Sequence, residues 1–113
     1  MYYYSLQINT NSSMIAEDVF KIMDVKDAIL DKHIWEYILK EDIIDEHIDF
    51  IGIFSRLLKI KIGQLEGIGI CKDMISIWYN YEYDGQCNIE FNANELKIIG
   101  ELGITFCISC WQK

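Results

Sequence analysis

Four cysteines are the residues of this chain whose chemistry is easiest to test against their spacing. Cys107 and Cys110 form a Cys-x-x-Cys pair inside the alternating segment 104–111, which predicts a strand. Three residues along a strand span about 10 Å and place the two side chains on opposite faces, whereas a disulfide needs Cα atoms within about 7 Å. Redox pairs of this kind also begin a helix, and none follows here. We therefore expect Cys71, Cys87, Cys107 and Cys110 to be structural thiols.

The other candidates for catalysis or metal binding lack companions at the required spacing. His33 and His47 are the only histidines, and no His-x-x-x-His pair or accompanying cysteine spacing supports a metal centre. Ser55, Ser76 and Ser109 have no nucleophile-elbow context. Carboxylates are abundant, so a pair of them carries little information. The sequence therefore predicts a protein that is not an enzyme and that uses no cofactor or metal.

Composition narrows the class of partner. The chain has 113 residues, is 51% hydrophobic and carries a formal net charge of -8, which indicates one globular domain with a real core. No apolar run approaches the roughly 18 residues of a membrane span, and the first residues do not resemble a signal peptide, so we expect a cytoplasmic protein. The acidity disfavours nucleic acid and anionic membranes and favours a basic protein partner, although solubility alone can also explain it.

The segment Ile75–Phe91 carries the clearest local pattern. It alternates on both sides of Asp84-Gly85, which predicts a β-hairpin. A three-residue loop with Gly85 in the left-handed conformation sorts apolar from polar side chains, whereas a two-residue loop mixes them. That register pairs Tyr81 with Cys87 and leaves Trp78 on the polar side. The residues expected beside Trp78 on this side include Asn80, Glu82, Asn88 and Glu90.

Periodicity and capping residues predict the remaining elements. Apolar positions from Ile44 onward recur at helical spacing, with Asp42 as N-cap and Gly63 near the end. Gly52 inside this helix is expected to mark a close packing contact. The other expected elements are a strand over 2–9, a helix over 14–23, a strand over 33–40 whose faces are ambiguous, a helix after the Asn92–Glu95 capping pair that buries Leu96 and Ile99, and a strand over 104–111.

These elements predict an α+β fold in the order β-α-β-α-β-β-α-β, with one mainly antiparallel sheet and helices packed on one face. The other face is then open to solvent or to a partner. Two tryptophans and a tyrosine in a polar setting there are typical of binding hot spots. The positions expected on the open face are Tyr3, Ser5, Gln7, Trp78, Asn80, Glu82, Asn88, Glu90, Thr105, Ser109 and Trp111.

A second candidate surface is the acidic row at the start of the long helix. Asp42, Asp45, Glu46 and Asp49 fall at helical spacing and could present carboxylates to a basic protein. The alternative is a solvated face whose charges favour the helix dipole by a few tenths of a kcal/mol each, roughly.

Several segments along the chain carry a family resemblance. They are the opening strand, a helix ending at Ile22-Met-Asp-Val25, a Trp35-Glu-Tyr37 strand, Leu57-Leu58, the run Leu65-Glu-Gly-Ile-Gly-Ile70, the hairpin, and Leu96-Lys-Ile-Ile-Gly-Glu-Leu-Gly-Ile104. Together they resemble an uncharacterised bacterial domain-of-unknown-function family of short α+β proteins. In type and size the chain is also similar to the immunity proteins of bacterial toxin systems, including contact-dependent growth inhibition. That likeness implies a cytoplasmic inhibitor that occludes a toxin domain, and it assigns no residues.

The leading hypothesis from the sequence is an immunity-type inhibitor that neutralises a cognate toxin domain, such as a basic nuclease. Its expected binding residues are Trp78, Asn80, Glu82, Asn88, Glu90, Trp111 and the acidic row Asp42, Asp45, Glu46 and Asp49. The alternative is a self-associating structural domain that buries the open sheet face in a homodimer.

Overall fold

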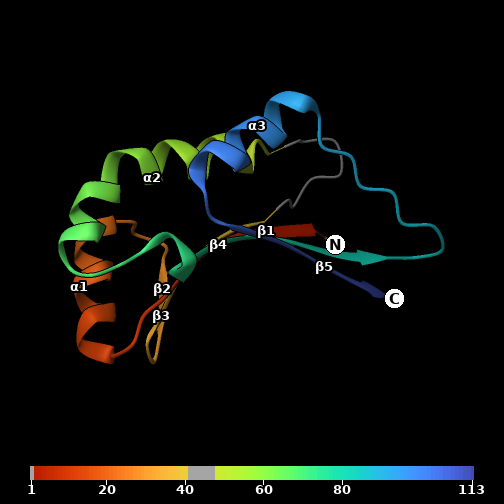
Figure 1. The fold of residues 1–113 in the computed structure, drawn as a ribbon. Helices are drawn as coiled ribbons and strands as arrows, with labels where there is room; N and C mark the ends of the chain where they lie inside the picture. Colours follow the sequence, from red (N-terminus) through yellow and green to blue (C-terminus); the bar gives the residue numbers. More distant parts are fainter. Residues whose placement is uncertain (1, 41–47) are drawn as a thin grey trace.

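The computed structural model describes residues 2–40 and 48–113, which form an α+β fold with one five-stranded sheet (Figure 1). The predicted class is confirmed, but the predicted order of elements is wrong. A short hairpin precedes the long helix, and a single strand, rather than two, lies between the long helix and the last helix. The elements are β1 (Tyr2–Asn9), α1 (Ser13–Met23), β2 (Ile29–Asp31), β3 (Ile34–Lys40), α2 (Phe50–Gly67), the 3-10 turn η1 (Lys72–Met74), β4 (Ile75–Tyr83), α3 (Ala93–Leu102) and β5 (Thr105–Gln112).

The sheet is mixed, with strand order β2-β3-β1-β4-β5. Three of its four strand pairs are antiparallel, and β5 runs parallel to β4. The parallel pair is joined through α3, the kind of crossover that parallel strands require. The first strand of the chain is therefore the central strand of the sheet, flanked by β3 and β4.

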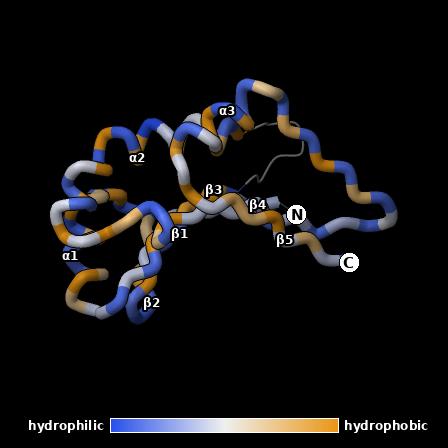
Figure 2. Tube along the Cα trace, viewed as in Figure 1, coloured by the Kyte–Doolittle hydropathy of each residue, from blue (hydrophilic) through white to orange (hydrophobic). Residues whose placement is uncertain are grey.

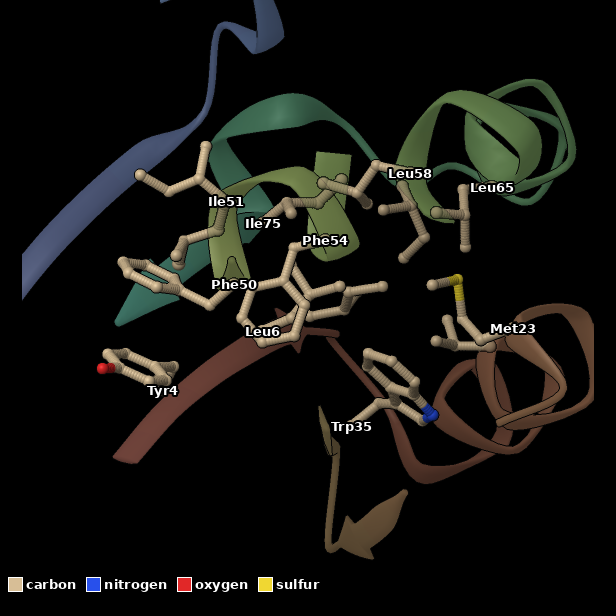
Figure 3. Close-up of a cluster of buried hydrophobic side chains, with 14 residues drawn as sticks. Tyr4, Leu6, Met23, Trp35, Phe50, Ile51, Phe54, Leu58, Leu65 and Ile75 are labelled. Atoms are coloured by element: carbon tan, nitrogen blue, oxygen red, sulfur yellow. The ribbon is translucent and has the colours of Figure 1, made fainter. Parts of the chain in front are cut away.

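The core lies between the sheet and the three helices, which all pack on the same face of the sheet (Figures 1 and 3). Because side chains alternate along a strand, β1 directs Tyr4, Leu6 and Ile8 toward the helices, and all three are buried. The Tyr4 ring stacks on Phe50 of α2 with 4.2 Å between ring centroids. Hydrophobic and hydrophilic residues alternate along most elements, as expected where each element buries one side (Figure 2).

The predicted hairpin is wrong beyond Gly85. Gly85 does adopt the expected left-handed conformation, with φ +82, but residues 86–92 form no strand. A strand has two edges, and both edges of β4 are already paired. On one edge of β4, the residues from Ile75 to Tyr81 pair with β1. On the other edge, the residues from Ser76 to Tyr83 pair with β5. Residues 84–92 instead connect β4 to α3.

The long helix begins later and ends later than its pattern predicts. Residues 48 and 49 are not helical, and α2 starts at Phe50 with Asp49 as its N-cap. The Asp49 side chain accepts a hydrogen bond from the Gly52 N–H at 3.1 Å. Asp42, the N-cap expected from the sequence, lies outside the described residues. Gly63 does not end the helix, since glycine is tolerated where neighbouring turns pack on the core.

The remaining predictions are confirmed in part. Ser12 caps α1, and Asn92 and Glu95 form the capping box of α3. Of the two residues predicted to be buried in α3, Ile99 does pack against the core, together with Ile98 and Leu102, whereas Leu96 is largely exposed. The strand whose two faces the sequence left ambiguous is β3. Its helix-facing side carries Trp35, Tyr37 and Leu39, which pair with the inward residues of β1.

Candidate functional site

One face of the sheet is covered by no helix among the described residues, and we call it the uncovered face. Strand register defines its members, because directly paired residues lie on the same face of a sheet. Its central strands are β1 and β4, with β3 and β5 on either side. The members on these four strands are Ile34, Glu36, Ile38, Lys40, Tyr3, Ser5, Gln7, Asn9, Ser76, Trp78, Asn80, Glu82, Thr105, Cys107, Ser109 and Trp111.

An apolar row crosses the middle of the uncovered face. In register, Ser5 lies between Ile38 and Trp78, and Trp78 is followed by Cys107. Ser5 is fully buried although no described helix covers this face, and its neighbours in register, Ile38 and Trp78, have much larger side chains. The Trp78 indole is fixed by its own N–H, which donates to Ser76 Oγ at 2.9 Å. Trp78 therefore presents a half-buried, oriented ring at the centre of the face.

A second aromatic group lies at the end of the face where β4 and β5 finish. Trp111 is 37% exposed, and its ring centroid is 6.5 Å from that of Tyr3. Glu82 lies opposite Trp111 in the parallel register. The arrangement combines two amphipathic rings with a carboxylate, a combination suited to contacting a protein with a cationic side chain at that point.

Polar residues on the uncovered face are partly engaged with one another. Gln7 Nε2 donates to Glu36 Oε2 at 2.7 Å, between β1 and β3. Asn80 is only 8% exposed, so it offers little surface to a partner despite its predicted position. Lys40 is the cation on β3, where it lies opposite Tyr3.

The structure separates Asn88, Glu90 and Asp49, which were also predicted to bind a partner, from this face. Asn88 and Glu90 lie in the irregular segment after Gly85 and do not belong to the sheet, because β5 holds the edge they were expected to occupy. Asp49 is engaged as the cap of α2. Asp42, Asp45, Glu46 and His47 lie outside the described residues.

Four members of the uncovered face on β3 were missed from the sequence, namely Ile34, Glu36, Ile38 and Lys40. The run Ile34–Leu39 is rich in apolar residues on both faces, so its alternation is weak. Glu36 and Lys40 are an even number of residues apart, so their side chains lie on the same face of the strand. These two charged residues were the available signal for which face is exposed to water.

Two thiols meet beside the stacked rings of Tyr2 and Tyr81, on the helix side of the sheet. Cys110 pairs in register with Tyr81, and the Cys87 thiol makes a side-chain hydrogen bond with Cys110. Desolvation, followed by this hydrogen bond, raises the pKa of Cys87 above its usual value. A hydrogen bond with Tyr2, whose ring stacks on it at 4.7 Å, raises the pKa of Tyr81. Cys107 lies on the opposite face, as the Cys-x-x-Cys spacing predicted.

The helix side also holds a cavity of about 160 Å³ between α2, α3 and the start of β5. Leu58, Ile62, Leu102 and Ile104 form its apolar lining, with Lys59, Lys72 and Glu101 around it. It is separated from the uncovered face by the sheet itself. This cavity could not be predicted from the sequence, because its walls come from elements that are distant along the chain.

Within residues 2–40 and 48–113, no group of three His, Cys, Asp or Glu side chains is arranged to hold a metal ion. None of the helices in these ranges is long and apolar enough to cross a membrane. Comparisons with protein-family models, curated proteins and solved structures gave no match.

Proposed function

We propose that this protein is a binding module of the immunity type, which neutralises a cognate toxin domain by docking the uncovered face on it. The observation that carries this proposal is the placing of Trp78, Trp111 and Tyr3 on a sheet face that no described helix covers. An inhibitor needs a surface and no reaction chemistry, so a face of this kind suffices for the task.

Aromatic anchors supply the affinity in this proposal. Binding hot spots are enriched in tryptophan and tyrosine because a large rigid ring buries much area at little entropic cost. Trp78 is held in place by its bond to Ser76, so its ordering is already achieved before a partner arrives. Such preorganisation reduces the free-energy cost of association.

Charge supports a basic partner. The chain has a net charge of -8, and Glu82 lies beside the exposed Trp111. A nuclease domain that binds phosphates presents a basic surface, and an acidic inhibitor is steered toward such a surface. Asp42, Asp45 and Glu46 would supply further carboxylates to the basic partner, and this part of the proposal rests on the sequence alone.

The first prediction is that Trp78→Ala weakens binding to the toxin domain by at least about 2 kcal/mol, or roughly 30-fold. If a toxin gene lies immediately upstream of this gene, the probe is its toxin domain, titrated calorimetrically with the purified protein. Phe20→Ala is the matched control, since Phe20 is an exposed aromatic residue on α1, away from the uncovered face. Normal affinity of a folded Trp78→Ala variant would rule out this interface.

Self-association through the same face is the second candidate function. The apolar row of Ile38, Trp78 and Cys107 favours it, since a homodimer interface is more apolar than a transient one. Sedimentation of the isolated protein separates the two candidates. A dimer that Trp78→Ala dissociates supports self-association through the uncovered face, whereas a monomer that binds the toxin domain supports inhibition.

A further inference from the structure

The cavity between α2, α3 and the start of β5 has the size and the apolar lining of a small-molecule site. α3 lies beside α2 above the sheet, and the chain descends from α3 into β5 (Figure 1). Leu58 is only 2% exposed, so the cavity reaches the main core, while Ile62, Leu102 and Ile104 are half-buried around it. Its volume of about 160 Å³ is close to that of an apolar cavity of roughly 150 Å³ that admits benzene. The apolar body of a ligand is therefore limited to about one ring or a short chain.

Two lysines belong to the lining of this cavity. Lys59 comes from α2 and Lys72 from η1, and both are exposed. Long lysine side chains extend an apolar wall with their stems while the ammonium groups stay in water. Within residues 2–40 and 48–113, neither lysine has a carboxylate within ion-pair distance. Their charges are therefore available to a ligand.

The one carboxylate in the lining is already near a cation outside it. Glu101 lies 4.0 Å from Lys97, one turn earlier on α3, and Lys97 is not among the described residues that line the cavity. Gly103 also leaves room for Lys72, since a Cβ there would lie 3.4 Å from Lys72 Cδ. Positive charge therefore prevails around an apolar cavity, in a chain whose net charge is -8.

We propose that this cavity binds a small organic acid, with its apolar body against Leu58, Ile62 and Leu102 and its carboxylate between Lys59 and Lys72. Ligand sites of this kind combine a mostly apolar lining with a few polar groups that fix the orientation, and ammonium groups bind carboxylates through charge-assisted hydrogen bonds. The net charge of the chain repels anions, but charges beyond about 8 Å are largely screened at physiological salt. The two nearby lysines therefore decide whether an anion is held. This site is independent of the proposed inhibitor function.

Titration of the isotope-labelled full chain with benzoate and with octanoate, followed through amide chemical shifts, tests the proposal at about 150 mM salt. Benzoate presents a flat ring and octanoate a flexible chain, so their ranking identifies the apolar body that the cavity takes. We expect at least one acid to bind saturably, with a dissociation constant at or below about 1 mM. The matching alcohols, benzyl alcohol and 1-octanol, lack the carboxylate, and each should bind about tenfold more weakly than its acid.

Variants of the two lysines test the recognition of the carboxylate. Lys59→Met and Lys72→Met keep much of the stem and remove the charge, so each should raise the dissociation constant about threefold and the double variant about tenfold. Lys61→Met is the matched control, since Lys61 lies on α2 but is not among the described residues that line the cavity, and it should bind like the wild type. Ile62→Phe should abolish binding, because the larger side chain fills the cavity.

Five results would overturn the proposal. They are the absence of saturable binding of either acid, an alcohol that binds as tightly as its acid, wild-type affinity in the double lysine variant, an equal loss in Lys61→Met, and wild-type affinity in a folded Ile62→Phe variant. Trp78→Ala should bind the acid like the wild type, because the sheet separates Trp78 from the cavity. This last measurement distinguishes failure of the acid site from failure of the proposed inhibitor surface.

Discussion

Trp78 and Asn80 lie two residues apart on the same face of β4, yet only one of them can serve a partner. Asn80 is enclosed by its neighbours, whereas Trp78 keeps part of its ring in contact with solvent. The difference is one of size, because a tryptophan ring extends beyond the layer that shorter side chains fill. At the scale of single residues, the candidate surface is therefore smaller and more aromatic than a list of outward positions suggests.

Cys87 allows a residue-scale prediction that depends on pH. Desolvation and the hydrogen bond with Cys110 raise its pKa, so the folded protein favours the thiol over the reactive thiolate. Alkylation of Cys87 should therefore require a higher pH than alkylation of a small-molecule thiol, as followed by mass spectrometry from about pH 7 to about pH 10. Cys110→Ala should lower the pKa and speed the reaction at a given pH.

Cys107→Ala is the control for this measurement, since Cys107 lies on the other face of β5. Equal pH midpoints for Cys87 in the two variants would contradict the thiol contact. The raised pKa of Cys87 also makes the stability of the fold depend on pH. Because folding raises this pKa, the thiol contributes stability that is present below its unfolded pKa, about 8.5, and that is lost as the pH rises through its folded pKa.

At the scale of elements, α2 contains two glycines in different surroundings. A Cβ on Gly52 would clash with Asp49 Oδ2, whereas a Cβ on Gly63 would meet nothing within 4 Å. The close packing contact expected at Gly52 is thus confirmed, and the atom that approaches is the helix cap itself. The glycine and the cap form a unit, since the N–H of Gly52 is also the donor to Asp49.

Alanine at these two positions should act in opposite directions. Gly63→Ala should stabilise the protein by up to about 1 kcal/mol through helix propensity. Gly52→Ala must displace the Asp49 carboxylate and lose a cap worth about 1 kcal/mol, so we expect it to be about 1–2 kcal/mol less stable than Gly63→Ala. Urea unfolding measures the difference. In an Asp49→Ala background the penalty at Gly52 should disappear, and its persistence would contradict the proposed clash.

Neighbouring elements also explain where prediction from sequence succeeds and fails. The alternation of side chains along each strand correctly predicted that Trp78, Glu82 and Trp111 share one face of the sheet, because this alternation depends only on neighbouring residues of the same strand. The position of Asn88 and Glu90 could not be predicted locally, since it depends on β5 taking the edge of β4 from more than twenty residues away along the chain. The start of α2 was misplaced because several acidic residues precede the apolar run, and Asp49 is the one that caps it.

At the scale of the whole molecule, the net charge governs the approach of partners. If a basic toxin domain is the partner, long-range attraction should raise the association rate at low salt. We expect that rate to fall by about tenfold between about 20 and about 200 mM salt, with a smaller change in the dissociation rate. Stopped-flow fluorescence of tryptophan measures both rates. An association rate independent of salt would argue against electrostatic steering by this acidic chain.

The central place of β1 in the sheet has a consequence for the order of events during synthesis. Residues Tyr2–Asn9 precede both of their partners, β3 and β4, in the chain. A strand cannot complete its ladders before its neighbours exist, so β1 must wait until synthesis has passed Tyr83. Until then its apolar side chains lack their final cover, which is the period in which a nascent chain is most open to wrong pairings. The first strand to be made is thus among the last to be fully enclosed.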